Sequence, residues 1–237
     1  AKSVVKRDVV RLVTPGTLTE ERLLEPGRAS LLVAVARRRL SDVSYAYGIA
    51  AVDISTGRFS VLETDARGLS VELARLEPRE IVCPDAIHED PELKEVWRDT
   101  PAAVTPLARE GLDPASGERR LKEFFGVATL DAFGAFSRAE IAAAAAALAY
   151  VERTQFGARP PLSPPRREGE SAAMLIDAAT RTNLELTRTL SGERAGSLLA
   201  TIDRTQTPGG SRLLAERLAG PLTDPAVLMR CPALHVP

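Results

Sequence analysis

Short apolar runs separated by turn residues mark the first half of the chain. Residues 30–36 are rich in Leu and Val, which is typical of a buried strand. Residues 45–54 alternate small, aromatic and β-branched side chains, and Ser55 to Gly57 supply a turn. Residues 58–63 then alternate apolar and polar positions. The pattern predicts three consecutive strands, of which the last two form a hairpin.

The chain then alternates between helix and strand patterns. A leucine repeat predicts a helix over 67–76, and residues 80–83 are expected to form a strand that stops at Pro84. A further strand is expected at 103–106, and a helix with one apolar face at 116–125. The order of three strands followed by alternating helices and strands (βββαβα) predicts an α/β fold with a ribonuclease-H-like sheet.

From Ser137 onward the pattern is helical. Ser137 with Glu140 forms a capping box that opens a long Ala-rich helix through about Gln155. Four prolines exclude helix from residues 156–170, which are expected to form a surface loop or an extended crossing segment. Asp177 is then expected to cap a helix that runs to about Leu190.

The last predicted element is an α-hairpin over residues 197–222. The spacing of its apolar residues predicts two short amphipathic helices with a buried leucine seam, built from Leu198, Leu199, Ile202, Leu213, Leu214 and Leu218. A tight Thr-Pro-Gly-Gly turn at residues 207–210 is expected to join the two helices. Gly209 and Gly210 allow positive φ at this corner, and Pro221 is expected to end the second helix.

Composition fits two globular domains in 237 residues, with 44% hydrophobic and 27% charged residues. The apolar runs are shorter than the roughly 20 residues that span a bilayer. The net charge of −1 argues against a surface that grips nucleic acid throughout. Cys83 and Cys231 form no C-x-x-C pair, so a reduced, cytoplasmic setting is expected. His88 and His235 are expected to be exposed, ordinary residues.

Asp53 is the strongest candidate for catalysis, since it lies at the end of a predicted strand. A two-metal nuclease needs several converging carboxylates, and residues 31–36 on the first strand contain none. We therefore expect Asp53 to bond the backbone of its own turn. The chain also contains no Gly-Lys-Ser/Thr phosphate loop and no convincing Ser-His-Asp or Cys-His set. No catalytic, cofactor-binding or metal-binding residue is assigned.

Arginine clusters are the remaining candidates for binding. They lie at residues 37–39, 119–120 and 166–167, and each is favoured as solvated surface over a phosphate contact. Residues that contact DNA therefore stay unassigned. Arg212 follows the Gly-Gly-Ser sequence of the hairpin, and we expect it to hold the corner shut by pairing with a partner such as Asp203.

Four sequence blocks in order give the chain a family resemblance. They are residues 10–18, 50–59, 174–186 and 197–222, and together they resemble the MutS family of DNA mismatch repair proteins up to about Met229. The resemblance implies a tail of the mismatch-binding domain or a linker at 1–28, a connector domain at 29–135, and the start of a helical lever or core domain at 136–237.

The resemblance also implies the function of the longer protein. Members of the family recognise mismatched duplex DNA as homodimers, bind ATP and Mg, and recruit MutL. This chain carries neither the mismatch-probing Phe-x-Glu nor the phosphate loop, so it is expected to couple those active ends and to dock partners.

Two departures from the family pattern stand beside the resemblance. Gly209-Gly210 replaces the usual Met-Gly pair, and residues 231–237 do not continue as the expected helix. The alternatives are a free-standing ribonuclease-H-like nuclease and a stand-alone interaction module.

Overall fold

The computed structural model describes residues 12–18, 28–42, 44–108, 114–156, 159–168, 174 and 176–224. Within these ranges one sheet has the strand order β5-β4-β1-β2-β3-β6. Its strands are β1 (Leu32–Arg39), β2 (Tyr45–Asp53), β3 (Arg58–Thr64), β4 (Glu80–Pro84), β5 (Ala103–Leu107) and β6 (Arg166–Arg167). β1, β2 and β3 are antiparallel neighbours, whereas β4 is parallel to β1 and β5 is parallel to β4.

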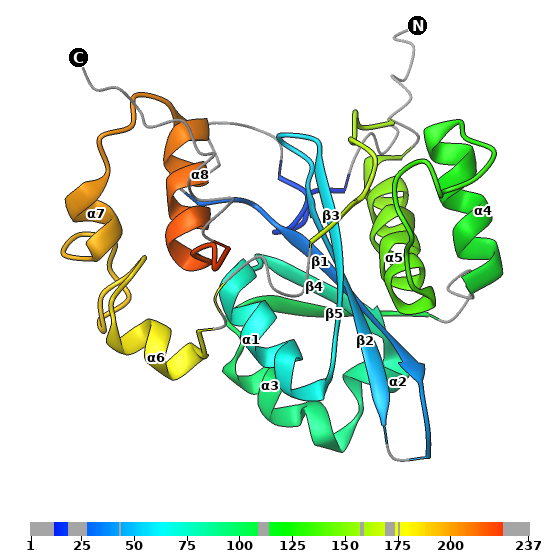
Figure 1. The fold of residues 1–237 in the computed structure, drawn as a ribbon, viewed down its shortest axis with the longest axis horizontal. Coiled ribbons are helices and arrows are strands. Elements are labelled where there is room, and N and C mark those ends of the chain that lie inside the picture. Colours follow the sequence, from blue (N-terminus) through cyan, green and yellow to red (C-terminus); the bar gives the residue numbers. More distant parts are fainter. Residues whose placement is uncertain are drawn as a thin grey trace, which may run out of the picture.

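Helices cover both faces of this sheet (Figure 1). They are α1 (Ala66–Leu76), α2 (Asp85–His88), α3 (Lys94–Asp99), α4 (Pro114–Phe125) and α5 (Arg138–Gln155), with a 3-10 turn at Pro91–Leu93. Alternate residues of each strand point to opposite faces, so Leu32 and Ala34 join the core under α5 while Val33 and Val35 join the core under α1. The predicted α/β fold is confirmed in this sheet and its helices.

Helix α5 begins at the predicted capping box. The Ser137 hydroxyl accepts from the Glu140 backbone N–H, and the Glu140 side chain accepts from the Ser137 N–H. The alanines at 143–147 are all buried, and these small side chains let the helix lie close to β1 and β2. The sequence had placed this helix after the connector domain, yet it packs on the sheet.

The described chain ends in a separate helical segment beside α1 (Figure 1). It contains α6 (Ala178–Asn183), α7 (Leu198–Ile202) and α8 (Pro208–Ala219). The predicted helix from Asp177 to about Leu190 is wrong in length. The helix stops at Asn183 because Glu185 adopts positive φ, and the carbonyls of Glu185 and Leu186 accept instead from the first amides of α7.

The predicted corner of the hairpin is also wrong. Thr207 caps α8 and Pro208 opens it, so Gly209 and Gly210 lie inside the first helical turn and neither has positive φ. The connection between the two helices is residues 203–207 instead, and α8 ends at Ala219 just before Gly220 and Pro221, as predicted.

The predicted burial of the leucine seam is wrong for most of its residues. Leu199 is 2% exposed, but Leu198, Ile202 and Leu213 are 42%, 43% and 49% exposed. Helix α7 has only five residues, so it is too short to cover the apolar side of α8.

The described part of the proline-rich stretch at residues 156–170 is extended, which was one of the two predicted alternatives. Its residues Arg166 and Arg167 pair with Ser60 and Val61 of β3, which adds a sixth strand that the sequence pattern did not reveal. The apolar run from Val9 to Val13 also predicts a short strand, and most of that run lies outside the described residues. In the described part of the chain, no helix combines the length and the apolar character that a membrane crossing requires.

Candidate functional site at the junction of sheet and helical segment

The Asp53 side chain forms hydrogen bonds within its own turn, as predicted. Its buried carboxylate accepts hydrogen bonds from the Ser55 backbone N–H at 2.9 Å and from the Ser55 hydroxyl at 2.6 Å. Gly57 closes the turn with φ of +74° and donates its N–H to the Asp53 carbonyl. No cluster of three or more potential metal ligands is found among the residues that the structure describes.

The arginine clusters have acidic partners on neighbouring elements. Arg37 pairs with Asp90, the N-cap of the 3-10 turn at Pro91–Leu93. Arg120 pairs with Glu152 across the two helices α4 and α5, and Arg167 pairs with the buried Glu140 at 2.8 Å. The hydrogen bond from Arg37 lowers the pKa of Asp90. One arginine of each cluster therefore links elements of the fold.

A cavity of about 540 Å³ lies between the sheet and the helical segment. Its walls come from β2, β3, the end of α1, residues 187–194 and α8. Six arginines and five carboxylates line it, namely Arg28, Arg58, Arg75, Arg188, Arg194 and Arg212 with Asp53, Glu77, Glu168, Glu193 and Glu216. The junction is therefore highly charged.

Ion pairs at the edge of this cavity join the two parts. Arg58 on β3 pairs with Glu216 on α8 and with Glu168, which lies 3.3 Å away just after β6. Glu168 also pairs with Arg75 on α1 at 2.6 Å. Burial raises the pKa of Glu168, but the charge of Arg75, the hydrogen bonds from Ser60 and Arg75, and the charge of Arg58 together outweigh this effect, so the pKa lies below its usual value.

A second contact joins the parts on another side of the cavity. The Thr187 hydroxyl donates to the Glu77 carboxylate at 2.8 Å. Glu77 is the C-cap of α1 and has positive φ, and its backbone N–H donates to the Leu73 carbonyl. The helical segment is thus attached to the end of α1 as well as to β3.

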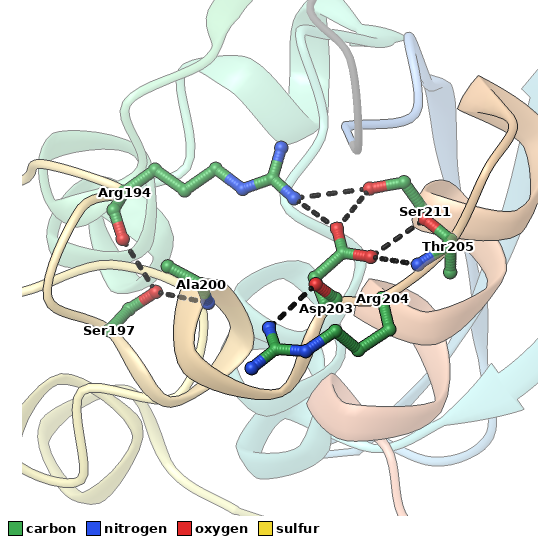
Figure 2. Close-up of polar contacts among 7 residues, drawn as sticks. All are labelled: Arg194, Ser197, Ala200, Asp203, Arg204, Thr205 and Ser211. Atoms are coloured by element: carbon green, nitrogen blue, oxygen red, sulfur yellow. Dashed lines mark hydrogen bonds and ion pairs between the residues drawn. The ribbon is translucent and has the colours of Figure 1, made fainter.

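Asp203 organises the corner between α7 and α8 (Figure 2). Its carboxylate accepts from the Arg194 guanidinium at 2.6 Å and from the Ser211 hydroxyl at 2.7 Å. It also accepts from the Thr205 backbone N–H at 2.9 Å and from the Thr205 hydroxyl at 2.7 Å. The bonds from Thr205 and Ser211, followed by the charge of Arg194, hold the pKa of Asp203 well below its usual range.

The partner of Asp203 is therefore Arg194, and the predicted pairing with Arg212 is wrong. Arg212 lies on α8 and lines the cavity instead, and none of the described residues forms a hydrogen bond or ion pair with it. Arg194 reaches Asp203 because residues 194–197 fold back before α7, where the Ser197 hydroxyl donates to the Arg194 carbonyl (Figure 2). The nine-residue separation between Arg194 and Asp203 has no helical or strand period that could have revealed this pair.

The remaining candidate residues have no role at the junction. His88 ends the short helix α2 and is half-buried, whereas His235 and Cys231 lie outside the described residues. Cys83 is fully buried on β4, and burial raises the pKa of its thiol to about 12, with a smaller effect from Asp85.

We expect the Cys83 thiol to resist labelling in the folded chain. A thiol with this pKa carries almost no thiolate at about pH 8, and the thiolate is the reactive form. In a Cys231→Ser variant, where Cys83 is the remaining cysteine, a disulfide reagent should react about a hundredfold more slowly than after unfolding in guanidinium. Equal rates in both states would show that Cys83 is accessible.

Two known family models match this chain, one for each of its two parts. The family model for MutS domain II matches residues 30–163, and that for MutS domain III matches residues 179–230. The two matches correspond to the sheet with its helices and to the helical segment.

Curated relatives agree with these matches. The DNA mismatch repair protein MutS of Azorhizobium caulinodans is 57% identical over 96% of this chain and 25% of its own length. The MutS proteins of Rhodopseudomonas palustris (strain HaA2) and Rhizobium meliloti (strain 1021) are 58% and 52% identical, over 97% and 95% of this chain and 25% and 24% of their own lengths. The chain spans about a quarter of the length of these relatives. With a domain model that matches more than half of its residues and relatives of this similarity, the chain belongs to the MutS family of DNA mismatch repair proteins.

Proposed function

We propose that this chain acts as the connector of a MutS-like protein, which passes movement between other parts of the longer protein and offers a docking surface for MutL. The coupling role is supported by the structure of the junction between the sheet and the helical segment. The sheet and the helical segment enclose a charged cavity, and Arg58, Glu216, Glu77 and Thr187 join them at its edge.

Rearranging this junction requires little free energy. The side chains of Arg58 and Glu216 are 46% and 41% exposed, and ion pairs at this exposure contribute about 0–1 kcal/mol. Small, polar interfaces between domains favour relative motion, whereas large apolar ones prevent it. Each part keeps its own hydrogen bonds when the junction opens, so motion would not require unfolding.

The division between the two parts follows from packing. We propose that the connector domain extends through α5 to about residue 163, beyond the boundary at 135 inferred from sequence, because α5 completes the core of the sheet. The strand order 5-4-1-2-3, with β1 to β3 antiparallel and β4 and β5 parallel to β1, supports a ribonuclease-H-like assignment for this sheet. The nuclease alternative lacks support, since the Asp53 carboxylate is used in its turn.

The remaining properties of the family are proposed for the longer protein. Mismatched DNA, ATP with Mg and homodimer formation would involve parts outside the quarter that this chain spans. The residues present do not fit a nucleotide site, because no lysine follows a glycine to form a phosphate loop. We propose a cytoplasmic location, where mismatch repair would meet chromosomal DNA.

The coupling role is tested by distances between spin labels on the two parts. Labels at the exposed positions Ser70 on α1 and Arg217 on α8, in a Cys231→Ser background, should give a distance distribution that broadens in Arg58→Ala. It should also broaden at about 0.5 M salt, which screens exposed charges. Arg39→Ala is the matched control, since it removes an exposed ion pair with Asp42 away from the junction. A distance distribution that stays narrow both in Arg58→Ala and at high salt would mean that the two parts form one rigid block.

The docking role is tested separately by titrating the isotope-labelled chain with MutL. Shifts are expected in the sheet domain, on residues 30–163. Shifts confined to the described helical residues 176–224 would move the docking site off the connector domain.

A further inference from the structure

Glu80 is a buried carboxylate whose role is not explained by the junction. It is the first residue of β4 and is 2% exposed. Three donors from three different parts of the chain reach it. The Gly16 backbone N–H donates to Oε2 at 3.0 Å, while the Thr105 and Tyr150 hydroxyls donate to Oε1 at 3.1 Å and 2.5 Å.

The donor Gly16 belongs to a compact turn at residues 14–17. The Thr14 N–H donates to the Thr17 hydroxyl and the Thr17 N–H donates to the Thr14 carbonyl, both at 3.0 Å. The Ser30 hydroxyl binds the Pro15 carbonyl at 3.1 Å, and Thr17 is fully buried. The turn is therefore docked on the sheet domain and not loose on its surface.

The turn fits its socket so closely that only glycine suits position 16. A Cβ there would lie 2.9 Å from the Glu80 Cβ and 3.1 Å from the Leu32 Cα. One more bond lies just upstream, where the Leu12 N–H donates to the Thr154 carbonyl at the end of α5 at 2.8 Å. β1, β4, β5 and α5 thus all contribute to holding residues 12–17.

A buried carboxylate is costly unless its oxygens are fully used. No cation in the described part of the chain forms an ion pair with Glu80, so hydrogen bonds alone compensate its burial. Burial raises the pKa of Tyr150, and the bond to Glu80 raises it further, which keeps the phenol protonated as a donor. An apolar side chain would fill this position at lower cost, but it would leave the Gly16 N–H buried without an acceptor.

We propose that Glu80 anchors the Thr14–Thr17 turn and thereby fixes the path of residues 12–17 along the sheet domain. The anchor ties residues 12–17 to β4, β5 and α5 at once, so a force applied at residue 12 acts directly on the core of the domain. This inference rests on the contacts around Glu80 and stands whether or not the chain docks MutL or moves at the junction.

Amide hydrogen exchange by NMR on the full 237-residue chain tests the anchor. In Glu80→Met the side chain keeps its length but offers no oxygen acceptor to the Gly16 N–H, whereas glutamine would keep one. We expect the Gly16 and Leu12 amides to exchange about tenfold faster or more, while Val35 in the centre of the sheet changes less than about twofold. Thr105→Val is the matched control, because it removes a donor to Oε1 and leaves the Gly16 bond to Oε2 in place.

The result that would overturn the anchor is an unchanged Gly16 amide in Glu80→Met, or equal acceleration at Gly16 and Val35, which would assign Glu80 to general stability. Gly16→Ala tests the same contact from the side of the turn if Glu80→Met fails to fold. Its added Cβ should expose the Leu12 and Thr17 amides while Val35 stays protected. Continued protection of Leu12 and Thr17 would also overturn the proposal.

Discussion

Replacing Gly48 with alanine should destabilise the chain more than any other single methyl group added to the sheet. Gly48 lies in the middle of β2, between Ala36 on β1 and Glu63 on β3. An added Cβ would overlap the carbonyl group of Ala139 and lie 2.8 Å from the backbone nitrogen of Glu140. These are backbone atoms in the first turn of α5, so they cannot rotate away as a side chain could.

We expect Gly48→Ala to lower the free energy of unfolding by about 3 kcal/mol or more, because α5 must lift from the sheet or β2 must bend. Urea unfolding followed by circular dichroism measures the loss. Gly209→Ala is the matched control, since its Cβ meets no atom within 4 Å and its φ is not positive. Alanine in a helix should leave that variant unchanged or more stable by up to about 1 kcal/mol. A stable Gly48→Ala variant would show that α5 does not rest on β2 as closely as described.

Replacing Asp203 with asparagine should open the corner of the helical segment without unfolding the sheet. An asparagine side chain has one acceptor oxygen and no charge, whereas Asp203 accepts from Arg194, Ser211 and Thr205. We expect the amides of Thr205 and of the first turn of α8 to exchange about tenfold faster or more. Asp177→Asn is the matched control in the same segment, because asparagine caps a helix as well as aspartate does.

Low pH should weaken the same corner between α7 and α8. The pKa of Asp203 lies below its usual value in the folded chain, so the stabilisation is complete above the unfolded pKa of about 3.9 and is lost as pH falls below it. The Thr205 amide should therefore lose protection below about pH 4 in the native chain and not in Asp203→Asn. A corner that stays protected in Asp203→Asn at neutral pH would show that other contacts hold α7 and α8 together.

Local patterns in the sequence predicted the secondary structure of the sheet domain well. The strands at 45–54 and 58–63 and the capping box at Ser137 and Glu140 were found close to their predicted positions. The turn at Asp53 was also correct. Each of these depends on residues within about four positions of one another, through the alternation of a strand or the hydrogen bonds of one helical turn.

The helical segment was predicted less well because its conformation depends on other parts of the chain. The amide of Leu198 uses the carbonyl of Glu185, which ends α6 early. The leucines of α7 and α8 have the spacing of a buried face, but the five residues of α7 cannot cover that face. Spacing shows which residues share one side of a helix, and it does not show what packs against that side.

The sequence by itself determined strands β1 to β5, helices α1, α4 and α5, the caps at Ser137 and Asp177, the Asp53 turn and the family, but not the short helices α2 and α3. The features that it determined depend on neighbouring residues or on ordered motifs. The tertiary structure alone decided that Arg194 pairs with Asp203, that Arg166 and Arg167 extend the sheet, and that Gly16, Thr105 and Tyr150 meet at Glu80. The physical reason is distance along the chain. A charged or polar group bonds whichever partner the packing of remote segments brings within about 3 Å, and no local period encodes that choice.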